Sequence, residues 1–236
     1  MSRKSRLSAA GAGLLSAMAV AASSHATVLA PGSTDSPDAF TAPAGATLVA
    51  SDSKFWLSSP VGTSHGAALS AVFVDPSNVF CAGCLDFMYQ IVNGDSFEDV
   101  NRVTAINFTG FSTDVGFVTN GSALPGGFFA TGTVHPETVD RNSAGDVIGF
   151  NFPEPFDALI PGRASNVLII ETDAKNFEAG HATITDALGN AATVSAFEPA
   201  AAVPEPASWA LMIAGAGAIG AALRLGRASS RRLVAA

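Results

Sequence analysis

Residues 84–93 read Cys-Leu-Asp-Phe-Met-Tyr-Gln-Ile-Val-Asn, and their pattern is the clearest indication of secondary structure in the chain. Its apolar side chains recur at every second position, at Leu85, Phe87, Tyr89 and Ile91. Successive side chains of an extended strand point to opposite faces, so the alternation places these four on one face. An acid, a methionine and a glutamine occupy the other face. The pattern predicts a β-strand.

Similar short runs follow along the chain, separated by turn residues such as Asn120-Gly121 and Pro161-Gly162. Residues 167–170 are apolar on both faces, which is typical of a central strand. Many short strands without a helical stripe predict an all-β fold, an antiparallel β-sandwich of jelly-roll or immunoglobulin-like type. The other predicted strands cover residues 104–108, 115–118, 147–152, 181–185 and 192–196. We expect a polar lead-in over 31–43 and an Ala/Pro linker over 197–203.

The N-terminus has the features of a signal peptide. Arg3, Lys4 and Arg6 precede an apolar stretch over 7–22, and Ser24-His25-Ala26 supplies small residues at the positions that a signal peptidase reads. We predict a signal peptide over 1–26 with cleavage after Ala26. An uncleaved anchor is the alternative.

The C-terminus combines three features in a fixed order. Pro204-Glu205-Pro206 is followed by an uncharged segment over 207–223 that has Trp209 at its start. The segment is close to the about 20 residues that span a bilayer, and a basic end at 224–236 belongs on the cytoplasmic side. The basic side chains are Arg224, Arg227, Arg231 and Arg232. A permanent single-pass anchor and a buried amphipathic helix are the alternatives.

Residues 203–232 closely resemble the PEP-CTERM sorting signal of Gram-negative bacteria. The resemblance implies recognition and processing by exosortase, a membrane-embedded transpeptidase, after transient insertion in the inner membrane. Residues 84–93 and 114–117 also look like strand motifs of one group of PEP-CTERM surface proteins, a similarity that spans about 70–200. It implies a β-rich domain. The expected processing partners are therefore exosortase and signal peptidase.

Between these two signals, residues 27–202 form the predicted exported domain. Residues 27–203 contain 19 acidic and five basic residues, a formal charge of about −14, whereas the whole chain carries −8. Phosphate backbones and anionic lipids repel such a domain, which argues against nucleic acid as a partner. A charge of this sign attracts divalent cations or basic partners. The alternative is that it serves solubility alone.

Cys81 and Cys84 form a Cys-x-x-Cys pair in a chain predicted to be exported. We expect a short-loop disulfide, because the compartment is oxidising. A redox pair, half of a metal site and two free thiols are the alternatives. Redox pairs of the thioredoxin type open a helix, whereas a predicted strand follows here, and a structural zinc site needs four ligands.

Residues 93–99 cluster acidic and amide side chains in one predicted turn. Calcium takes six to eight oxygen ligands, and this turn offers about half of them. A cation site is the hypothesis, and a solvated hairpin loop is the alternative. Its candidate ligands are Asn93, Asp95, Glu98 and Asp99. No cofactor is predicted.

Two further patterns suggest alternative activities. Residues 62–66 match the Gly-x-Ser-x-Gly elbow of serine hydrolases, with Ser64 as nucleophile. The match lies early in the domain, and no alternating β/α pattern surrounds it.

Trp56 or Tyr89 would serve as a stacking platform if the domain bound carbohydrate. The Gly-x-Gly-x-x-Gly match at 215–220 lies inside the uncharged segment and has no acid after it.

The sequence therefore favours a non-enzymatic protein. We expect an exported protein with a structural or adhesive role in exopolysaccharide or biofilm. Its expected destination is the cell surface, the outer membrane or the extracellular matrix.

Overall fold

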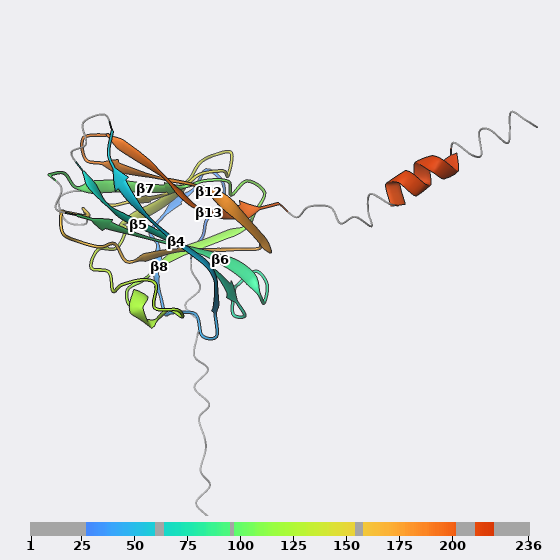
Figure 1. Ribbon diagram of the computed structural model, residues 1–236, viewed down its shortest axis with the longest axis horizontal. Coiled ribbons are helices and arrows are strands. Elements are labelled where there is room, and N and C mark those ends of the chain that lie inside the picture. Colours follow the sequence, from blue (N-terminus) through green and yellow to red (C-terminus); the bar gives the residue numbers. More distant parts are fainter. Residues whose placement is uncertain (1–26, 60–63, 95–96, 154–157, 202–210, 220–236) are drawn as a thin grey trace, which may run out of the picture.

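The computed structural model describes residues 27–59, 64–94, 97–153, 158–201 and 211–219. Within 27–201 the chain forms two β-sheets that lie face to face (Figure 1). This arrangement confirms the predicted all-β sandwich.

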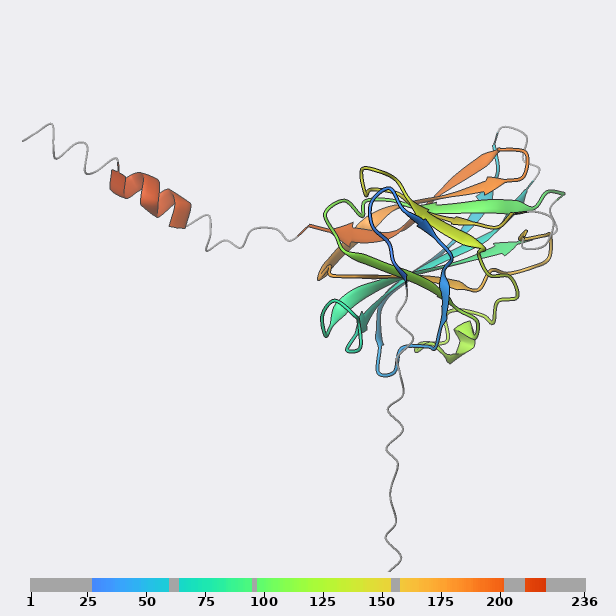
Figure 2. The same ribbon diagram turned by 180° about the vertical axis from the view of Figure 1, so that it is seen from behind.

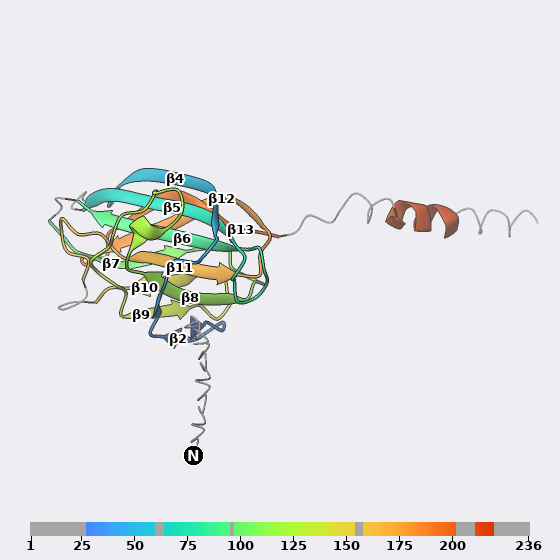
Figure 3. The same ribbon diagram turned by 90° about the horizontal axis from the view of Figure 1, so that it is seen from below.

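The first sheet, sheet A, has seven strands in the order β1-β8-β11-β6-β5-β4, and β3 pairs with β8 as well. Figure 3 shows β4, β5, β6, β11 and β8 one after another across this sheet. Its strands are β1 Thr27–Val28, β3 Asp38–Phe40, β4 Thr47–Leu57, β5 His65–Asp75, β6 Cys84–Asn93, β8 Thr113–Val118 and β11 Val167–Thr172.

The second sheet, sheet B, has six strands in the order β13-β12-β7-β10-β9-β2. Its strands are β2 Thr34–Asp35, β7 Val100–Ala105, β9 Thr138–Arg141, β10 Ile148–Asn151, β12 Asn176–Asp186 and β13 Ala191–Ala200. The hairpin β12–β13 pairs over ten residue positions and ends at a turn that contains Gly189, whose φ is +83°. A positive φ favours glycine there.

The N-terminal segment joins the two sheets. The short strands β1 and β3 pair with β8 in sheet A, while β2 between them pairs with β9 in sheet B (blue in Figure 2). The pairing of β3 with β8 is parallel, so sheet A is mixed. The predicted lead-in over 31–43 is therefore wrong in part, because β2 and β3 are too short for their alternation to be visible.

The main core lies between the sheets and contains the predicted apolar face of residues 84–93. Leu85, Phe87, Tyr89 and Ile91 are all buried in it. The ring of Phe87 packs edge-on against Phe108, with ring centroids 5.9 Å apart. Removal of this apolar surface from water stabilises the fold by about 25 cal/mol per Å².

A second, smaller apolar cluster covers the outer face of sheet A. Met88 and Ile169 lie on that face, and Leu124 and Phe129 cover them from the long connection between β8 and β9. The residues between the apolar positions of β6 are therefore buried as well. Sheet A is a buried layer over this part of its surface.

Several predicted element ends differ from the structure. The strand predicted over 104–108 is β7, which ends at Ala105, and Asn107 has a φ of 68° that no strand residue adopts. The linker predicted over 197–203 is strand up to Ala200. Strands β4 and β5 were not predicted, because many of their residues are alanine, serine and other weakly patterned types.

Most of the two export signals lies outside the described residues. This holds for the signal peptide with Ala26, for Pro204-Glu205-Pro206 with Trp209, and for the four arginines of 224–232. Residues 211–219 of the predicted membrane segment are helical with exposed side chains. Among the described residues, no helix has the length and apolarity needed to cross a membrane.

Candidate functional site

A row of carboxylates crosses the outer face of sheet A. Asp86 on β6 pairs in register with Glu171 on β11, and Glu171 pairs in register with Asp114 on β8. Residues directly opposite each other on neighbouring strands share a face of the sheet. Three acids therefore lie side by side, where like charges destabilise a sheet.

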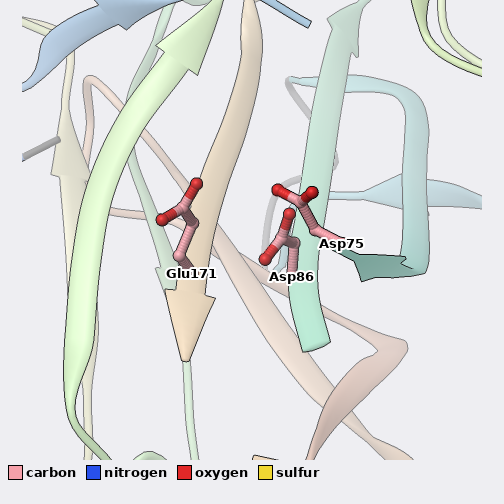
Figure 4. Close-up of side chains that lie close together, drawn as sticks. All are labelled: Asp75, Asp86 and Glu171. Atoms are coloured by element: carbon pink, nitrogen blue, oxygen red, sulfur yellow. The ribbon is translucent and has the colours of Figure 1, made fainter. Parts of the chain in front are cut away.

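Asp75, the last residue of β5, completes a compact cluster with two members of this row. One carboxylate oxygen each of Asp75, Asp86 and Glu171 lies within 4.8 Å of the others. Figure 4 shows the Asp75 and Asp86 carboxylates next to each other and Glu171 on the adjoining strand. Asp75 and Asp86 are fully buried, and Glu171 is partly buried. We call these three residues the carboxylate cluster.

The connection between β5 and β6, residues 76–83, covers the carboxylate cluster. The Ser77 backbone N–H and hydroxyl both donate to Asp75 Oδ1, at 2.7 Å each. Asn78 Nδ2 donates to Asp86 Oδ1 at 2.8 Å, and Asn78 Oδ1 accepts the N–H groups of Phe80 and Cys81. Asn78 thus ties the loop to the acid below it.

Two more contacts hold this loop. The Val79 N–H donates to Glu171 Oε2 at 3.3 Å. Cys81 and Cys84 are paired at the end of the loop, with Cα atoms 5.4 Å apart, a separation that suits a disulfide. Gly83 between them has a φ of +79°, which glycine adopts without strain. The predicted disulfide therefore closes the loop that covers the carboxylate cluster.

The second oxygens of the two buried aspartates accept no hydrogen bond from an N–H or a hydroxyl group of the described residues. These are Asp75 Oδ2 and Asp86 Oδ2, and both Asp114 oxygens are in the same state. Burial, the charge of Glu171, the charge of Asp75 and a hydrogen bond between the Asp75 and Asp86 side chains raise the pKa of Asp86 to about 9, against a lowering by the Asn78 hydrogen bond. Burial raises the pKa of Asp114 to about 6. Buried carboxylates of this kind are costly without a compensating cation.

The ligands that the carboxylate cluster offers are all oxygens. Calcium and magnesium are held by such oxygens, whereas zinc and copper favour imidazole and thiolate. Within the part of the chain that the structure describes, this is the one group of three or more His, Cys, Asp or Glu side chains close enough to share a metal ion. The arrangement suits binding of a hard cation.

The turn predicted to bind a cation lies elsewhere, at the other end of β6. Asn93 is buried, and its Nδ2 donates to the carbonyl oxygens of Glu98 and Leu159 at 3.0 and 2.8 Å. Asp95 lies outside the described residues. The Asp99 carbonyl accepts the N–H of Ala187. The cation site at this turn stays a prediction.

Ser64 does not lie in a strand-to-helix turn. The residue leads directly into strand β5 and is completely buried. Its hydroxyl donates to the Glu98 carbonyl at 3.3 Å and to Asp186 Oδ2 at 3.4 Å. An elbow nucleophile stands exposed above a parallel sheet, so the geometry around Ser64 differs from the elbow in both respects.

The predicted stacking platforms for carbohydrate are wrong. Trp56 is 2% exposed and Tyr89 is 3% exposed. The Tyr89 hydroxyl donates to the Phe197 carbonyl at 2.7 Å. Both rings fill the space between the sheets, because the inward face of each strand is where large apolar side chains are buried. Neither ring is open to a sugar.

Sequence reasoning missed the carboxylate cluster. Its members lie 11 and 85 positions apart in the chain and meet only through strand pairing. A signal was nevertheless present, because Asp86 interrupts an otherwise apolar stretch and Glu171 directly follows the apolar residues 167–170. An acid in a strand that is buried on both faces requires a partner.

The comparison with family models gives one match. Residues 202–228 match the PEP-CTERM protein-sorting motif. The C-terminus therefore carries an exosortase sorting signal, as the sequence predicted. Such a signal implies export, processing by exosortase and association with the cell surface. No curated protein and no solved structure matches the chain.

Proposed function

We propose that this protein is a structural or adhesive component of the cell surface or extracellular matrix, released there from the inner membrane by exosortase. The observation that carries the proposal is the sorting motif at 202–228, placed directly after a β-sandwich. In this proposal signal peptidase cuts after Ala26, and residues 207–223 span the inner membrane until processing.

The surface charge of the exported part supports a role outside the cell. Residues 27–203 carry a formal charge of about −14, which keeps the domain soluble and repels anionic lipid and nucleic acid. In exopolysaccharide or biofilm, such a domain attaches through cations or basic partners rather than through nucleic acid.

The test is a comparison of the wild type with a variant in which Pro204, Glu205 and Pro206 are all changed to alanine. Each is produced in the native host, followed by cell fractionation and measurement of the intact mass. We expect the wild type outside the inner membrane, without residues 1–26 and without the segment after the motif. The variant should remain full length in the inner membrane.

A matched control changes Pro153 to alanine, because this proline lies in the sandwich and precedes another Glu-Pro pair. The control should be sorted like the wild type. If wild type and triple variant both stay full length in the inner membrane, the tail is an ordinary anchor and the proposal fails.

The adhesive role is tested by two separate measurements, of matrix-bound protein and of surface-attached biomass. A strain with the triple alanine variant in place of the wild type should retain less protein in the extracellular polysaccharide fraction and form less surface-attached biomass. Equal biomass despite loss of sorting would limit the proposal to the sorting route.

We also propose that the role is non-catalytic. The burial of Ser64 and its hydrogen bonds to Glu98 and Asp186 support this. Chromogenic esters should not be turned over by the folded wild type. Turnover that disappears in Ser64→Ala would contradict the proposal.

A further inference from the structure

We propose that Asp75, Asp86 and Glu171 bind one calcium ion beneath the loop 76–83. The site lies in the sandwich, apart from the sorting motif, so the inference goes beyond the proposed function. It rests on the spacing of the three carboxylates, on the buried second oxygens of Asp75 and Asp86, which accept no hydrogen bond from an N–H or hydroxyl group, and on the loop that covers the cluster.

The spacing allows one ion to reach all three side chains. Oxygen ligands lie about 2.3–2.6 Å from calcium, so two oxygens on opposite sides of the ion are about 4.6–5.2 Å apart. The candidate oxygens of the cluster lie within 4.8 Å of one another. An ion placed among them therefore reaches Asp75, Asp86 and Glu171 with at most small shifts of the side chains.

The hydrogen bonds leave one oxygen of each buried aspartate available to the ion. Oδ1 of Asp75 accepts hydrogen bonds from Ser77, and Oδ1 of Asp86 accepts one from Asn78. Oδ2 of each accepts no hydrogen bond from an N–H or hydroxyl group, although both residues are fully buried. A buried carboxylate oxygen without a partner is rare in folded proteins, and a missing ion is one of its ordinary explanations.

Among the described residues, no lysine or arginine forms an ion pair with these aspartates. Lys54 pairs with Asp52 and Arg102 pairs with Asp140, and neither pair involves Asp75 or Asp86. Asp114 adds further negative charge next to Glu171 in the same row. A bound divalent cation offsets the repulsion within this row.

Calcium suits the carboxylate cluster better than other common divalent cations. Its irregular coordination tolerates carboxylates fixed on three strands, whereas magnesium requires near-octahedral geometry at about 2.0–2.1 Å. Water completes the coordination, since three carboxylates supply fewer than the six to eight oxygens of calcium. Sites in extracellular proteins bind calcium with a Kd of about 0.1–1 mM, and we expect this range.

The ion would join β5, β6 and β11 and hold the loop 76–83 in place. Asp75 ends β5, Asp86 lies near the start of β6 and Glu171 lies near the end of β11. A protein that binds the ion only when folded is stabilised by it. Calcium outside the cell would thus strengthen this end of the sandwich after export.

The test uses the full-length protein in mild detergent. Thermal unfolding is measured in EDTA, in calcium chloride and in magnesium chloride, and calcium binding is measured by isothermal titration calorimetry. Calcium at about 100-fold above Kd should raise Tm by about 5–10 °C for a domain of this size. Calorimetry should give one ion per chain.

Two variants locate the ion. Asp86→Asn and Glu171→Gln keep the side-chain shape and remove one charge each, so either should weaken calcium binding at least tenfold and abolish most of the Tm rise. The matched control is the double variant Asp95→Asn/Asp99→Asn, which removes two acids from the turn at the other end of β6 and should respond like the wild type.

Four results would overturn the proposal. They are a wild type whose Tm is the same in calcium and in EDTA, wild-type affinity in folded Glu171→Gln, an equal response to magnesium, and loss of calcium binding in Asp95→Asn/Asp99→Asn. The last would assign the ion to the turn. Because Glu171 is only partly buried, Glu171→Gln is the variant expected to fold if Asp86→Asn does not.

Discussion

An acidic side chain on sheet B and a row of acidic side chains on sheet A differ in the groups that contact their carboxylate oxygens. On sheet B, Arg102 donates to both oxygens of Asp140, at 2.6 and 2.7 Å, and Asn151 donates to the same carboxylate at 2.9 Å. On sheet A, Asp86 and Asp114 flank Glu171 in one row, and both aspartates have buried oxygens without partners. Sheet B supplies a cation, Arg102, to this acid, whereas among the described residues no lysine or arginine forms an ion pair with Asp86 or Asp114.

The difference shows which acidic side chains a bound ion, rather than an arginine of the protein, would compensate. Arg102 lowers the pKa of Asp140, so that acid stays charged at ordinary pH. In the proposed site, a bound calcium ion offsets the charge of the carboxylate cluster of sheet A in the same way. The Asp140 carboxylate is therefore compensated within sheet B, while one end of sheet A responds to the calcium concentration of the medium.

A second arginine of sheet B has the largest expected effect on stability. Arg141 on β9 is buried and donates to the carbonyl oxygens of Leu29, Phe108 and Gly145, among others. Arg141→Met leaves several buried carbonyl oxygens unsatisfied and should lower the free energy of unfolding by at least about 3 kcal/mol. Chemical denaturation measures the change.

The control for this variant is Arg163→Met, since Arg163 is exposed. It should change the free energy of unfolding by less than about 0.5 kcal/mol. Similar losses in both variants would show that the hydrogen bonds of Arg141 do not decide the stability.

Opening the loop over the carboxylate cluster should have the next largest effect. Cys81→Ser/Cys84→Ser removes the bond that closes the loop, and a closed loop this short contributes about 2 kcal/mol or less. Calcium affinity should fall as well, because Asn78 and Val79 hold the acids through the same loop. Denaturation in EDTA and calorimetry with calcium separate the two effects, and unchanged calcium affinity would contradict the link.

Replacement of Asp114 should raise the free energy of unfolding, by a smaller amount than the two losses above. Asp114→Asn removes one charge from the row next to Glu171, where like charges destabilise by up to about 1 kcal/mol. The variant should therefore be about 1 kcal/mol more stable than the wild type in EDTA at neutral pH. A less stable variant would indicate that the Asp114 carboxylate has a favourable partner.

The smallest expected effect is the pH dependence of stability that the Arg102–Asp140 pair of sheet B produces. Because Arg102 lowers the pKa of Asp140 in the folded state, the pair stabilises the protein above the unfolded pKa of about 4, and this contribution is lost as pH falls through the lower folded value. Asp140→Asn should lower the free energy of unfolding at neutral pH by at most about 1 kcal/mol, since the pair is partly exposed.

The measurement is denaturation of wild type and Asp140→Asn at a series of pH values. The two proteins should differ at neutral pH and converge below about pH 4. A difference that grows as the pH falls would contradict the assignment.

Local patterns predicted much of the fold. The alternation over 85–91 gave β6, and the apolar residues 167–170 gave β11 at the centre of sheet A. The sorting motif was also predictable, because its recognition depends on contiguous residues at one end of the chain. Strands β1 and β2 were not, because two residues are too few to show a period.

The carboxylate cluster required the register of the sheet. Asp75, Asp86 and Glu171 come from three strands, and a shift of one residue in any pairing would turn a side chain to the opposite face. Trp56 shows the same limit, because no alternation around it indicated which face it occupies, whereas Tyr89 belongs to the apolar face that the alternation over 85–91 predicted.

The most direct test of the calcium site is a crystal structure of the protein grown with calcium. The account predicts a single ion in contact with oxygens of Asp75, Asp86 and Glu171, at about 2.3–2.6 Å from each. Electron density for water alone at that position, in crystals that contain millimolar calcium, would contradict it.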